Sequence, residues 1–313
     1  AYYPGSTASS ANAGDVWLNN NSVSQTSLPL GSFSHFVMLH EIGHALGLAH
    51  PGDYNAAPGV SITYGANAQF IQDSHQYTVM SYFDESNTGV TGGLGYPDTL
   101  MLFDLLALHQ QYGADYSYQA GDTVYGFNAT ASGGTYDFTL NTTPFLCIWD
   151  GSGEDTIDLS GYSMAQLLTL EAGEFSNVGG YVGNFSIAIG AVIENAIGGS
   201  GNDTITGNSA DNQITGGGGT DHFVMGIDRS AATITAIAGG YQVVSSLGTD
   251  QLFGVEFIQF DDQLFDLSTV SAGPTTGADA LTGTTGADII DLLAGNDSYD
   301  GLGGNDTITG GAG

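Results

Sequence analysis

The sequence predicts an α+β domain followed by an all-β domain built as a parallel β-roll. Two observations support this fold class. Residues 40 to 50 read HEIGHALGLAH, which places two histidines four positions apart on one face of a helix. From residue 198 onward, Gly-rich segments with a regularly placed Asp recur every nine residues. The first pattern needs a helix, and the second needs short strands joined by tight turns.

Composition excludes several classes of partner. The chain has 313 residues, a single basic residue and a formal net charge of −32. This charge repels nucleic-acid phosphates and anionic membrane surfaces, so we expect neither partner. No apolar run approaches the roughly 20 residues of a membrane helix. The one cysteine, Cys147, lies in the apolar run PFLCIWD, where we expect a buried strand residue and not a nucleophile.

The histidine motif predicts a metal site. Residues four apart share a helix face, so His40 and His44 can direct their imidazoles at one point. We expect the helix to be capped by Ser32 or Ser34 and to run to about residue 46. Gly47 then permits a reversal that brings His50 to the same point. Three imidazoles with an open position suit a catalytic zinc.

Two plainer explanations compete with zinc. A helical His is often an ordinary core residue, and HExxH occurs by chance. Here Glu41, Gly47 and His50 all fall at the positions that a zinc protease needs, which favours the metal site.

The extended motif resembles a known family. HExxHxxGxxH is the metzincin signature, and HEIGHALGLAHPGDYN with the later YTVMSYF is similar to the serralysin branch of secreted bacterial proteases. The resemblance implies a metzincin-like zinc protease domain with Met80 in a turn beneath the zinc. It also implies that Tyr82 is a further, detachable zinc ligand and a hydrogen-bond donor to the oxyanion.

The repeats predict calcium sites. Three nine-residue units fill residues 198 to 224, and four more follow from residue 275. They match the GGxGxDxUx nonapeptide of RTX proteins, a calcium-binding parallel β-roll. Successive strands go to opposite sides, so residues 18 apart stack about 4.8 Å from each other. Stacked carboxylates repel unless Ca²⁺ lies between the turns. The expected ligands are Gly198, Ser200, Asp203, Asp221, Asp279, Asp288, Asp297 and Asp306. Asn212 replaces an Asp, so its neighbouring site should carry less charge.

A further calcium site follows only from the resemblance. Residues 121–128 and 149–162 are similar to serralysin segments that hold a calcium ion between them. Members of that family often have Arg where this chain has Gln119, whose carbonyl still serves. The implied ligands are Gln119, Gly121, Thr123, Asp150, Ser152 and Asp155.

Other segments carry weaker expectations. Residues 14–19 resemble a short strand, and residues 98–112 a helix with Asp98 as its N-cap. His109 on that helix is expected to be structural. His35 has no metal-ligand spacing, and His75, five residues before Met80, is a candidate for a substrate contact.

The expected domains are a zinc protease domain (1–118), a β-domain with the first calcium roll (119–225), a small β capping unit (226–272) and a second RTX array (273–313). The upstream residues resemble only the end of a serralysin sheet. We therefore expect a fragment that lacks the N-terminal part of the catalytic domain and the C-terminal end, and an N-terminal piece as partner.

The sequence thus predicts a zinc endopeptidase stabilised by calcium. The serralysin resemblance implies that it is secreted, extracellular and exported by type I secretion. Glu41 is the expected general base toward a zinc-activated water. Proteins and peptides are the expected substrates, and a proteinaceous inhibitor is a further expected partner. Three alternatives remain open: a non-catalytic RTX adhesion module with a vestigial zinc site, a zinc hydrolase of small amides, and an inactive processed fragment.

Overall fold

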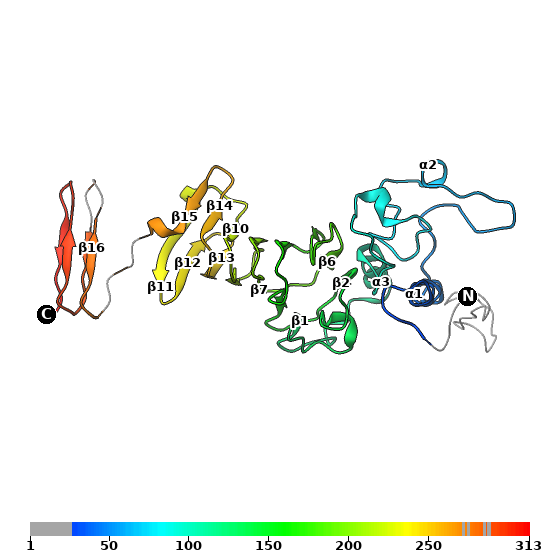
Figure 1. The fold of residues 1–313 in the computed structure, drawn as a ribbon, viewed down its shortest axis with the longest axis horizontal. Helices are drawn as coiled ribbons and strands as arrows, with labels where there is room; N and C mark the ends of the chain where they lie inside the picture. The colour runs from blue at the N-terminus through cyan, green and yellow to red at the C-terminus, as the bar shows by residue number, and fades with distance from the viewer. Residues whose placement is uncertain (1–26, 271–272, 274–275, 284–285, 287–288) are drawn as a thin grey trace.

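The computed structural model describes residues 27–270, 273, 276–283, 286 and 289–313. Its elements lie along one long axis, with the helices at one end and the C-terminal strands at the other (Figure 1). The expected strand at 14–19 and Asp288 lie outside the described residues. Within the described part of the chain, no helix combines the length and apolarity needed to cross a lipid bilayer.

The histidine motif forms a helix, as predicted. Helix α1 spans Phe33–Ala45, and the Ser32 side chain accepts a hydrogen bond from the His35 backbone N–H (3.2 Å). This confirms Ser32 as the N-cap. The helix ends before Gly47, whose φ of +97° lies in the left-handed region that glycine favours. The chain therefore reverses immediately after the second histidine. A one-turn helix, α2 (Tyr64–Asn67), follows in the next loop.

Helix α3 begins later than predicted. It spans Leu102–Tyr112 with Met101 as its N-cap, so the expectation that Asp98 is the cap is wrong. The side chain of Asp104, in the first turn, accepts a hydrogen bond from the Met101 N–H (2.9 Å), which satisfies a backbone donor at the helix N-terminus. Asp98 instead ties three segments together, because its carboxylate accepts from the backbone N–H groups of residues 31 and 145 and from the side-chain amide of residue 141.

The rest of the molecule is mostly short parallel strands in stacked sheets. The first sheet contains, in order, β1 (Val124–Gly126), β3 (Thr156–Asp158), β7 (Asn195–Ile197), β9 (Gln213–Thr215), β13 (Gly248–Phe253), β12 (Gly240–Ser245) and β11 (Thr233–Ile237). The second contains β15 (Leu264–Asp266), β14 (Phe257–Gln259), β10 (His222–Val224), β8 (Thr204–Thr206) and β4 (Leu167–Thr169). A smaller sheet contains β2 (Leu146–Ile148), β6 (Phe185–Ile187) and β5 (Phe175–Ser176). Strands β7 to β10 alternate between the first two sheets, as a roll requires.

The register confirms the predicted stacking. Strands β8 and β10 pair in parallel, with Thr204 opposite His222. In the second array, β16 (Ala280–Thr282) pairs with β18 (Ser298–Asp300), and β17 (Ile289–Asp291) pairs with β19 (Thr307–Thr309). In each pair the partners are two nonapeptides apart.

The core of the first roll is formed by the central residue of each three-residue strand. Ala196, Ile205, Ile214 and Phe223 are each at most 2% exposed. Burying one Ile or Phe side chain stabilises the fold by about 1.5–3 kcal/mol. Cys147 is buried in β2, which confirms the prediction of a strand residue.

Within the expected capping unit, the described residues 226–270 continue the same sheets. Strands β11, β12 and β13 form an antiparallel meander, and β13 pairs in parallel with β9. Strand β14 pairs with β10 and β15 in the second sheet. The hairpins therefore extend the first roll at its far end.

Candidate metal centre

The three histidines of the motif are each held by a backbone carbonyl. Nδ1 of His40 contacts the Val79 oxygen (2.7 Å), Nδ1 of His44 the Leu48 oxygen (2.9 Å), and Nδ1 of His50 the Tyr54 oxygen (2.9 Å). A carbonyl can only accept, so Nδ1 carries the proton in all three rings. Each neutral ring therefore has its lone pair on Nε2.

The Nε2 atoms face one another. The His44 and His50 Nε2 atoms are 3.1 Å apart, and those of His50 and His40 are 3.2 Å apart. Since none carries a proton in this tautomer, these contacts are not hydrogen bonds and are repulsive without a cation. A tetrahedral zinc with Zn–N bonds of 2.0–2.1 Å would separate its nitrogens by about 3.3 Å. The donor set therefore fits zinc.

Burial keeps His40 neutral. Desolvation, the largest influence, acts with the nearby His44 and His50 against the Val79 hydrogen bond, and together they lower the pKa of His40 to about 4. Burial also lowers the pKa of His50. Two of the three imidazoles thus hold a free lone pair at neutral pH, which a metal ligand needs.

Asp104 fixes the loop beneath His40. Its carboxylate accepts from Thr78 Oγ1 (2.5 Å) and from the Val79 N–H (2.8 Å), and the Val79 carbonyl in turn holds His40. The adjacent Met80 is 1% exposed and packs directly below α1, where a Cβ on Gly43 would lie 2.5 Å from its sulfur. The predicted Met-turn residue therefore lies against the helix turn between the two histidines.

Asp73 fixes the other side of the same loop. It is fully buried and accepts from Tyr54 Oη (2.7 Å) and Ser81 Oγ (2.7 Å). The Tyr54 carbonyl holds His50, so this network links His50 to the Met80 loop. Asp73 and Asp104 act through other residues, and motif spacing did not reveal either of them.

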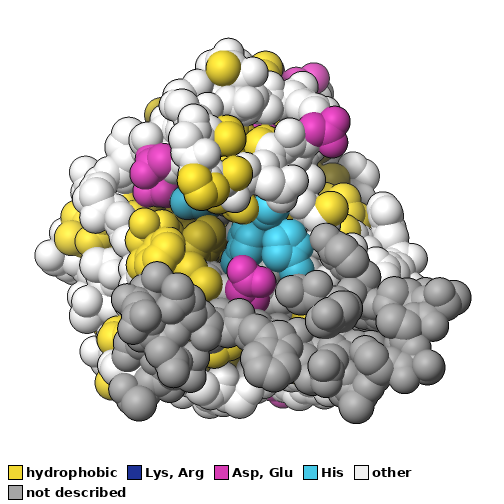
Figure 2. Space-filling view, turned by 90° about the vertical axis from the view of Figure 1, so that its right-hand side faces the viewer, with side chains coloured by type: hydrophobic (Ala, Val, Ile, Leu, Met, Phe, Trp, Pro, Cys, Tyr) yellow, Lys and Arg dark blue, Asp and Glu magenta, His cyan; other side chains and the backbone are white. Residues whose placement is uncertain are grey.

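Glu41 and Tyr82 border the histidines. The Tyr82 ring centroid lies 4.5 Å from that of His50 and 5.9 Å from that of His40. Burial and the charge of Glu41 raise the pKa of Tyr82, so its phenol keeps the proton. Both residues line a cavity of about 400 Å³. Figure 2 shows the histidines beside a hydrophobic patch, with no Lys or Arg on the described part of that face.

The remaining histidines of this region have other partners. His109 packs its ring against Trp149 with a centroid separation of 4.1 Å, as expected of a structural residue. His35 Nε2 contacts the Asp98 carbonyl (3.0 Å). His75 lines the cavity beside Glu41.

The residues of the calcium site that the resemblance implies between residues 119 and 155 lie close together around Thr123. Thr123 Oγ1 donates to the carbonyls of Gly121 (2.7 Å) and Gln119 (3.2 Å), and its backbone N–H donates to Asp155 (2.8 Å). The second Asp155 oxygen is buried without a hydrogen-bond partner. Burial, with Asp150 close by, raises the pKa of Asp155 to about 7.

The other two residues of this set contact each other. The Ser152 N–H donates to Asp150 (2.9 Å), whose second oxygen accepts from Tyr125 Oη (2.6 Å). A buried carboxylate pair with a free oxygen is the environment that a cation neutralises.

The roll turns stack carboxylates as predicted. The Asp203 N–H donates to Asp221 (2.7 Å), and the Asp279 N–H donates to Asp297 (2.9 Å). Asp203 also accepts from the N–H of residue 199, between Gly198 and Ser200. One Asp221 oxygen is buried without a partner, and burial raises the pKa of Asp221 to about 6.

Of the remaining positions in the second array, Asp306 approaches residue 301, where a Cβ would lie 2.3 Å from its Oδ2. Its stacking partner Asp288 lies outside the described residues. At the substituted position, the Asn212 side chain donates to the carbonyl of Glu194 (2.9 Å) and to Asn208 (2.8 Å).

Three acidic residues at these turns escaped the sequence analysis. Glu194 accepts from the Asp155 N–H, Glu256 from the Asp221 N–H, and Asp250 from the Asn212 N–H. None belongs to a nonapeptide. The contacts of Glu256 and Asp250 arise because β13 and β14 continue the sheets after the inserted meander.

Known proteins are similar to this chain over about two thirds of its length. The family description "Peptidase M10 serralysin C terminal" matches residues 114–310. Metalloprotease AprA of Pseudomonas entomophila is 43% identical over 220 residues, which cover 68% of this chain and 45% of that protein. Serralysin of Proteus mirabilis is 44% identical over 204 residues, which cover 64% of this chain and 41% of that protein. The chain thus spans less than half the length of each relative. Since the family match covers more than half of the chain, this protein belongs to the serralysin family of M10 peptidases.

Proposed function

We propose that this protein is a zinc-dependent endopeptidase that hydrolyses peptide bonds in proteins. The main observation in support is the set of three Nε2 atoms that face one another, 3.1 and 3.2 Å apart in successive pairs, beside Glu41. His40, His44 and His50 would hold the zinc. Relatives named metalloprotease and serralysin support the same activity.

The residues of the chain take distinct roles in this proposal. Zinc would supply Lewis-acid activation of a water and of the scissile carbonyl. Glu41 removes the proton of the attacking water and delivers it to the leaving amine. Tyr82, protonated because its pKa is raised, donates a hydrogen bond to the developing oxyanion. The cavity beside Glu41 receives a substrate side chain.

The wider organisation is part of the same proposal. Residues 1–118 form the metzincin-like protease domain and carry the chemistry, 119–225 form the first calcium roll, 226–272 cap it, and 273–313 form the second array. Calcium neutralises the stacked carboxylates of the turns. The protein acts outside the cell after type I export, on protein and peptide substrates. A proteinaceous inhibitor is the further partner proposed.

Casein hydrolysis tests this function. The protein, supplied with zinc and calcium, is compared with its Glu41→Gln and Tyr82→Phe variants. We expect Glu41→Gln to abolish turnover while one equivalent of zinc still binds. Tyr82→Phe should reduce turnover about 10²-fold or more, as removal of an oxyanion donor does. Zinc binding with no hydrolysis by the wild type would contradict the endopeptidase proposal and favour a binding module. Unchanged turnover in Tyr82→Phe would contradict the oxyanion role.

A further inference from the structure

The lining of the cavity beside Glu41 combines polar side chains with apolar and aromatic ones, and Ser81 and His40 are among the polar ones. The cavity volume is about 400 Å³, and Glu41 and Tyr82 place the cavity next to the reacting atoms. His75, which is not one of the three facing histidines, also lines it. The apolar and aromatic lining residues are Phe33, Phe36, Val37, Ile62 and Tyr96.

His75 is held rigidly. Its backbone N–H donates to the Phe83 carbonyl (2.9 Å). Its ring packs against Phe36 with a centroid separation of 4.7 Å, and against Tyr96 at 5.8 Å. The residue is 7% exposed. A side chain fixed in this way presents a defined edge to a ligand.

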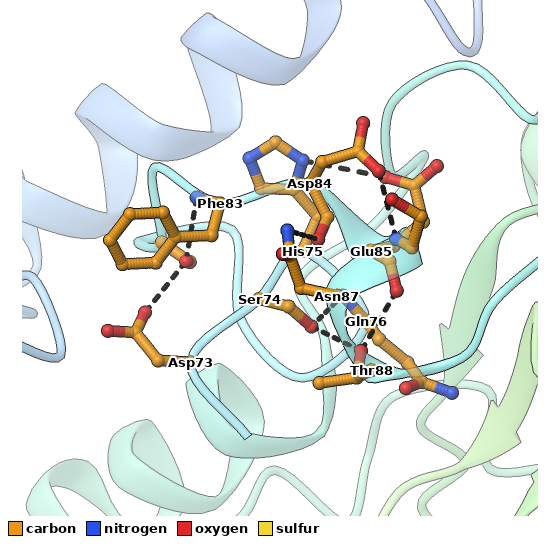
Figure 3. A network of polar contacts seen from close by, with 11 residues as sticks. Asp73, Ser74, His75, Gln76, Phe83, Asp84, Glu85, Asn87 and Thr88 are labelled. Carbon is orange, nitrogen blue, oxygen red and sulfur yellow. Dashed lines mark hydrogen bonds and ion pairs between the residues drawn. The ribbon is translucent and has the colours of Figure 1, made fainter. Parts of the chain in front are cut away.

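The Glu85 carboxylate faces one nitrogen of this ring. Figure 3 shows one ring nitrogen of His75 directed at Glu85. Nδ1 lies 3.7 Å from the Glu85 carboxylate, too far for a hydrogen bond, and it has no other partner. The Glu85 side chain is 11% exposed, so its charge is weakly screened and favours the proton on Nδ1. The lone pair then lies on Nε2.

The segment behind His75 is braced by its own contacts. Ser74 Oγ and Thr88 Oγ1 are 2.7 Å apart, and Thr88 Oγ1 donates to the Glu85 carbonyl (3.0 Å). These contacts fix the short 3₁₀ turn Glu85–Thr88 that carries the carboxylate. His75 and Glu85 therefore form a preorganised pair at the wall of the cavity (Figure 3).

We propose that His75, oriented by Glu85, makes this cavity select a substrate side chain that carries a hydroxyl donor on an aromatic ring, as tyrosine does. The aromatic walls pack against the ring, and Nε2 of His75 accepts the phenolic hydrogen. Acidic side chains are repelled by the nearby carboxylates of Glu41 and Glu85. This inference rests on the proposed peptidase function.

The test compares peptides that differ by one hydroxyl. Two N-acyl tripeptide hydroxamates, with a tyrosyl or a phenylalanyl side chain next to the hydroxamate, are titrated into the zinc- and calcium-loaded protein by calorimetry. We expect about tenfold tighter binding of the tyrosyl compound, the effect of one well-placed hydrogen bond. The matching peptide substrates should show the same ratio of kcat/KM.

Variants separate recognition from folding. His75→Phe should bring the tyrosyl-to-phenylalanyl ratio to about one or below while retaining affinity for the phenylalanyl compound. Glu85→Gln, which keeps shape but removes the charge, should lower the ratio. A merely structural role for His75 would weaken both compounds equally and leave the ratio unchanged.

The outcomes distinguish the two proposals. Equal affinity of the wild type for both hydroxamates, or tighter binding of a lysyl analogue, would overturn the His75 inference. Discrimination between hydroxamates without hydrolysis of any peptide would support the inference and contradict the peptidase function.

Discussion

Exchanging Asp and Asn between two equivalent turns of the first roll should change stability in opposite directions, depending on calcium. Asp221 and Asn212 occupy the same position of successive nonapeptides. Burial raises the pKa of Asp221 from 3.8 to about 6, so its charge at neutral pH is unfavourable without a cation. Asn212 is neutral and donates two hydrogen bonds. The turn that contains Asp221 should therefore need calcium for full stability, and the turn that contains Asn212 should not.

The magnitude follows from these contacts. At about 1.4 kcal/mol per pH unit, keeping Asp221 charged at pH 7 costs about 3 kcal/mol, or about half of that once solvent screening at the turn is included. Asp221→Asn removes this cost but weakens the bond from the Asp203 N–H. The variant should gain about 1 kcal/mol without calcium.

The reciprocal variant has a different cause. Asn212→Asp loses the bonds to Glu194 and Asn208 and places a carboxylate against their oxygens, which costs about 1–3 kcal/mol without calcium.

Thermal unfolding followed by circular dichroism at pH 7.5 measures both effects. In a calcium chelator, Asp221→Asn should unfold about 2–4 °C above wild type, and Asn212→Asp below it. In excess calcium the order should reverse, and Asp221→Asn should be less stable than the wild type. If Asp221→Asn were less stable than wild type in chelator, the argument that its carboxylate is unfavourable without a cation would be wrong.

Three further predictions concern the metal centre and the carboxylates. Asp104→Leu should weaken zinc binding about 10–100-fold, because the Val79 N–H loses its acceptor and the Val79 carbonyl no longer holds His40 firmly. A zinc titration measures the affinity, and Asp104→Asn, which keeps an acceptor, is the control. The pKa of His40 is lowered to about 4, so between pH 6.5 and 4 the unfolded state binds more protons than the folded state. The contribution of His40 to the unfolding free energy of the zinc-free protein should be complete above pH 6.5 and fall by up to about 3 kcal/mol toward pH 4. Denaturant unfolding of the wild type and of His40→Gln at several pH values measures this contribution. Asp155 has a raised pKa of about 7, so its contribution to the stability of the calcium-free protein is present below pH 3.8 and lost as the pH rises through 7. Thermal melts at several pH values should show a weaker dependence of stability on pH for Asp155→Asn than for the wild type. An unchanged dependence would contradict this prediction.

The repeating part of the fold could be predicted because each element is local. Nine residues form one turn and one strand, so the sequence period alone determines that Asp203 stacks near Asp221. The histidine helix could be predicted for the same reason, since its cap at Ser32, the histidines of the motif and Gly47 lie within one short segment.

The supporting residues could not be predicted, because their partners are distant in sequence. Asp73 meets Tyr54 across 19 residues, and Asp104 meets Val79 across 25. An Asp inside an apolar helix was the only visible signal of Asp104. The Asp98 cap was mispredicted because its hydrogen-bond partners are distant in sequence. The carboxylate accepts from Gly31, Asn141 and Phe145, which are separated from it by 67, 43 and 47 positions.

X-ray absorption at the zinc edge tests the central claim most directly. The protein loaded with one equivalent of zinc should show three imidazole nitrogens at about 2.0–2.1 Å. His44→Ala, which removes one of the three facing Nε2 atoms, should lose one imidazole from the spectrum or fail to retain zinc. A zinc environment dominated by oxygen ligands in the wild type, unchanged in His44→Ala, would contradict the assignment of His40, His44 and His50 as the catalytic zinc site.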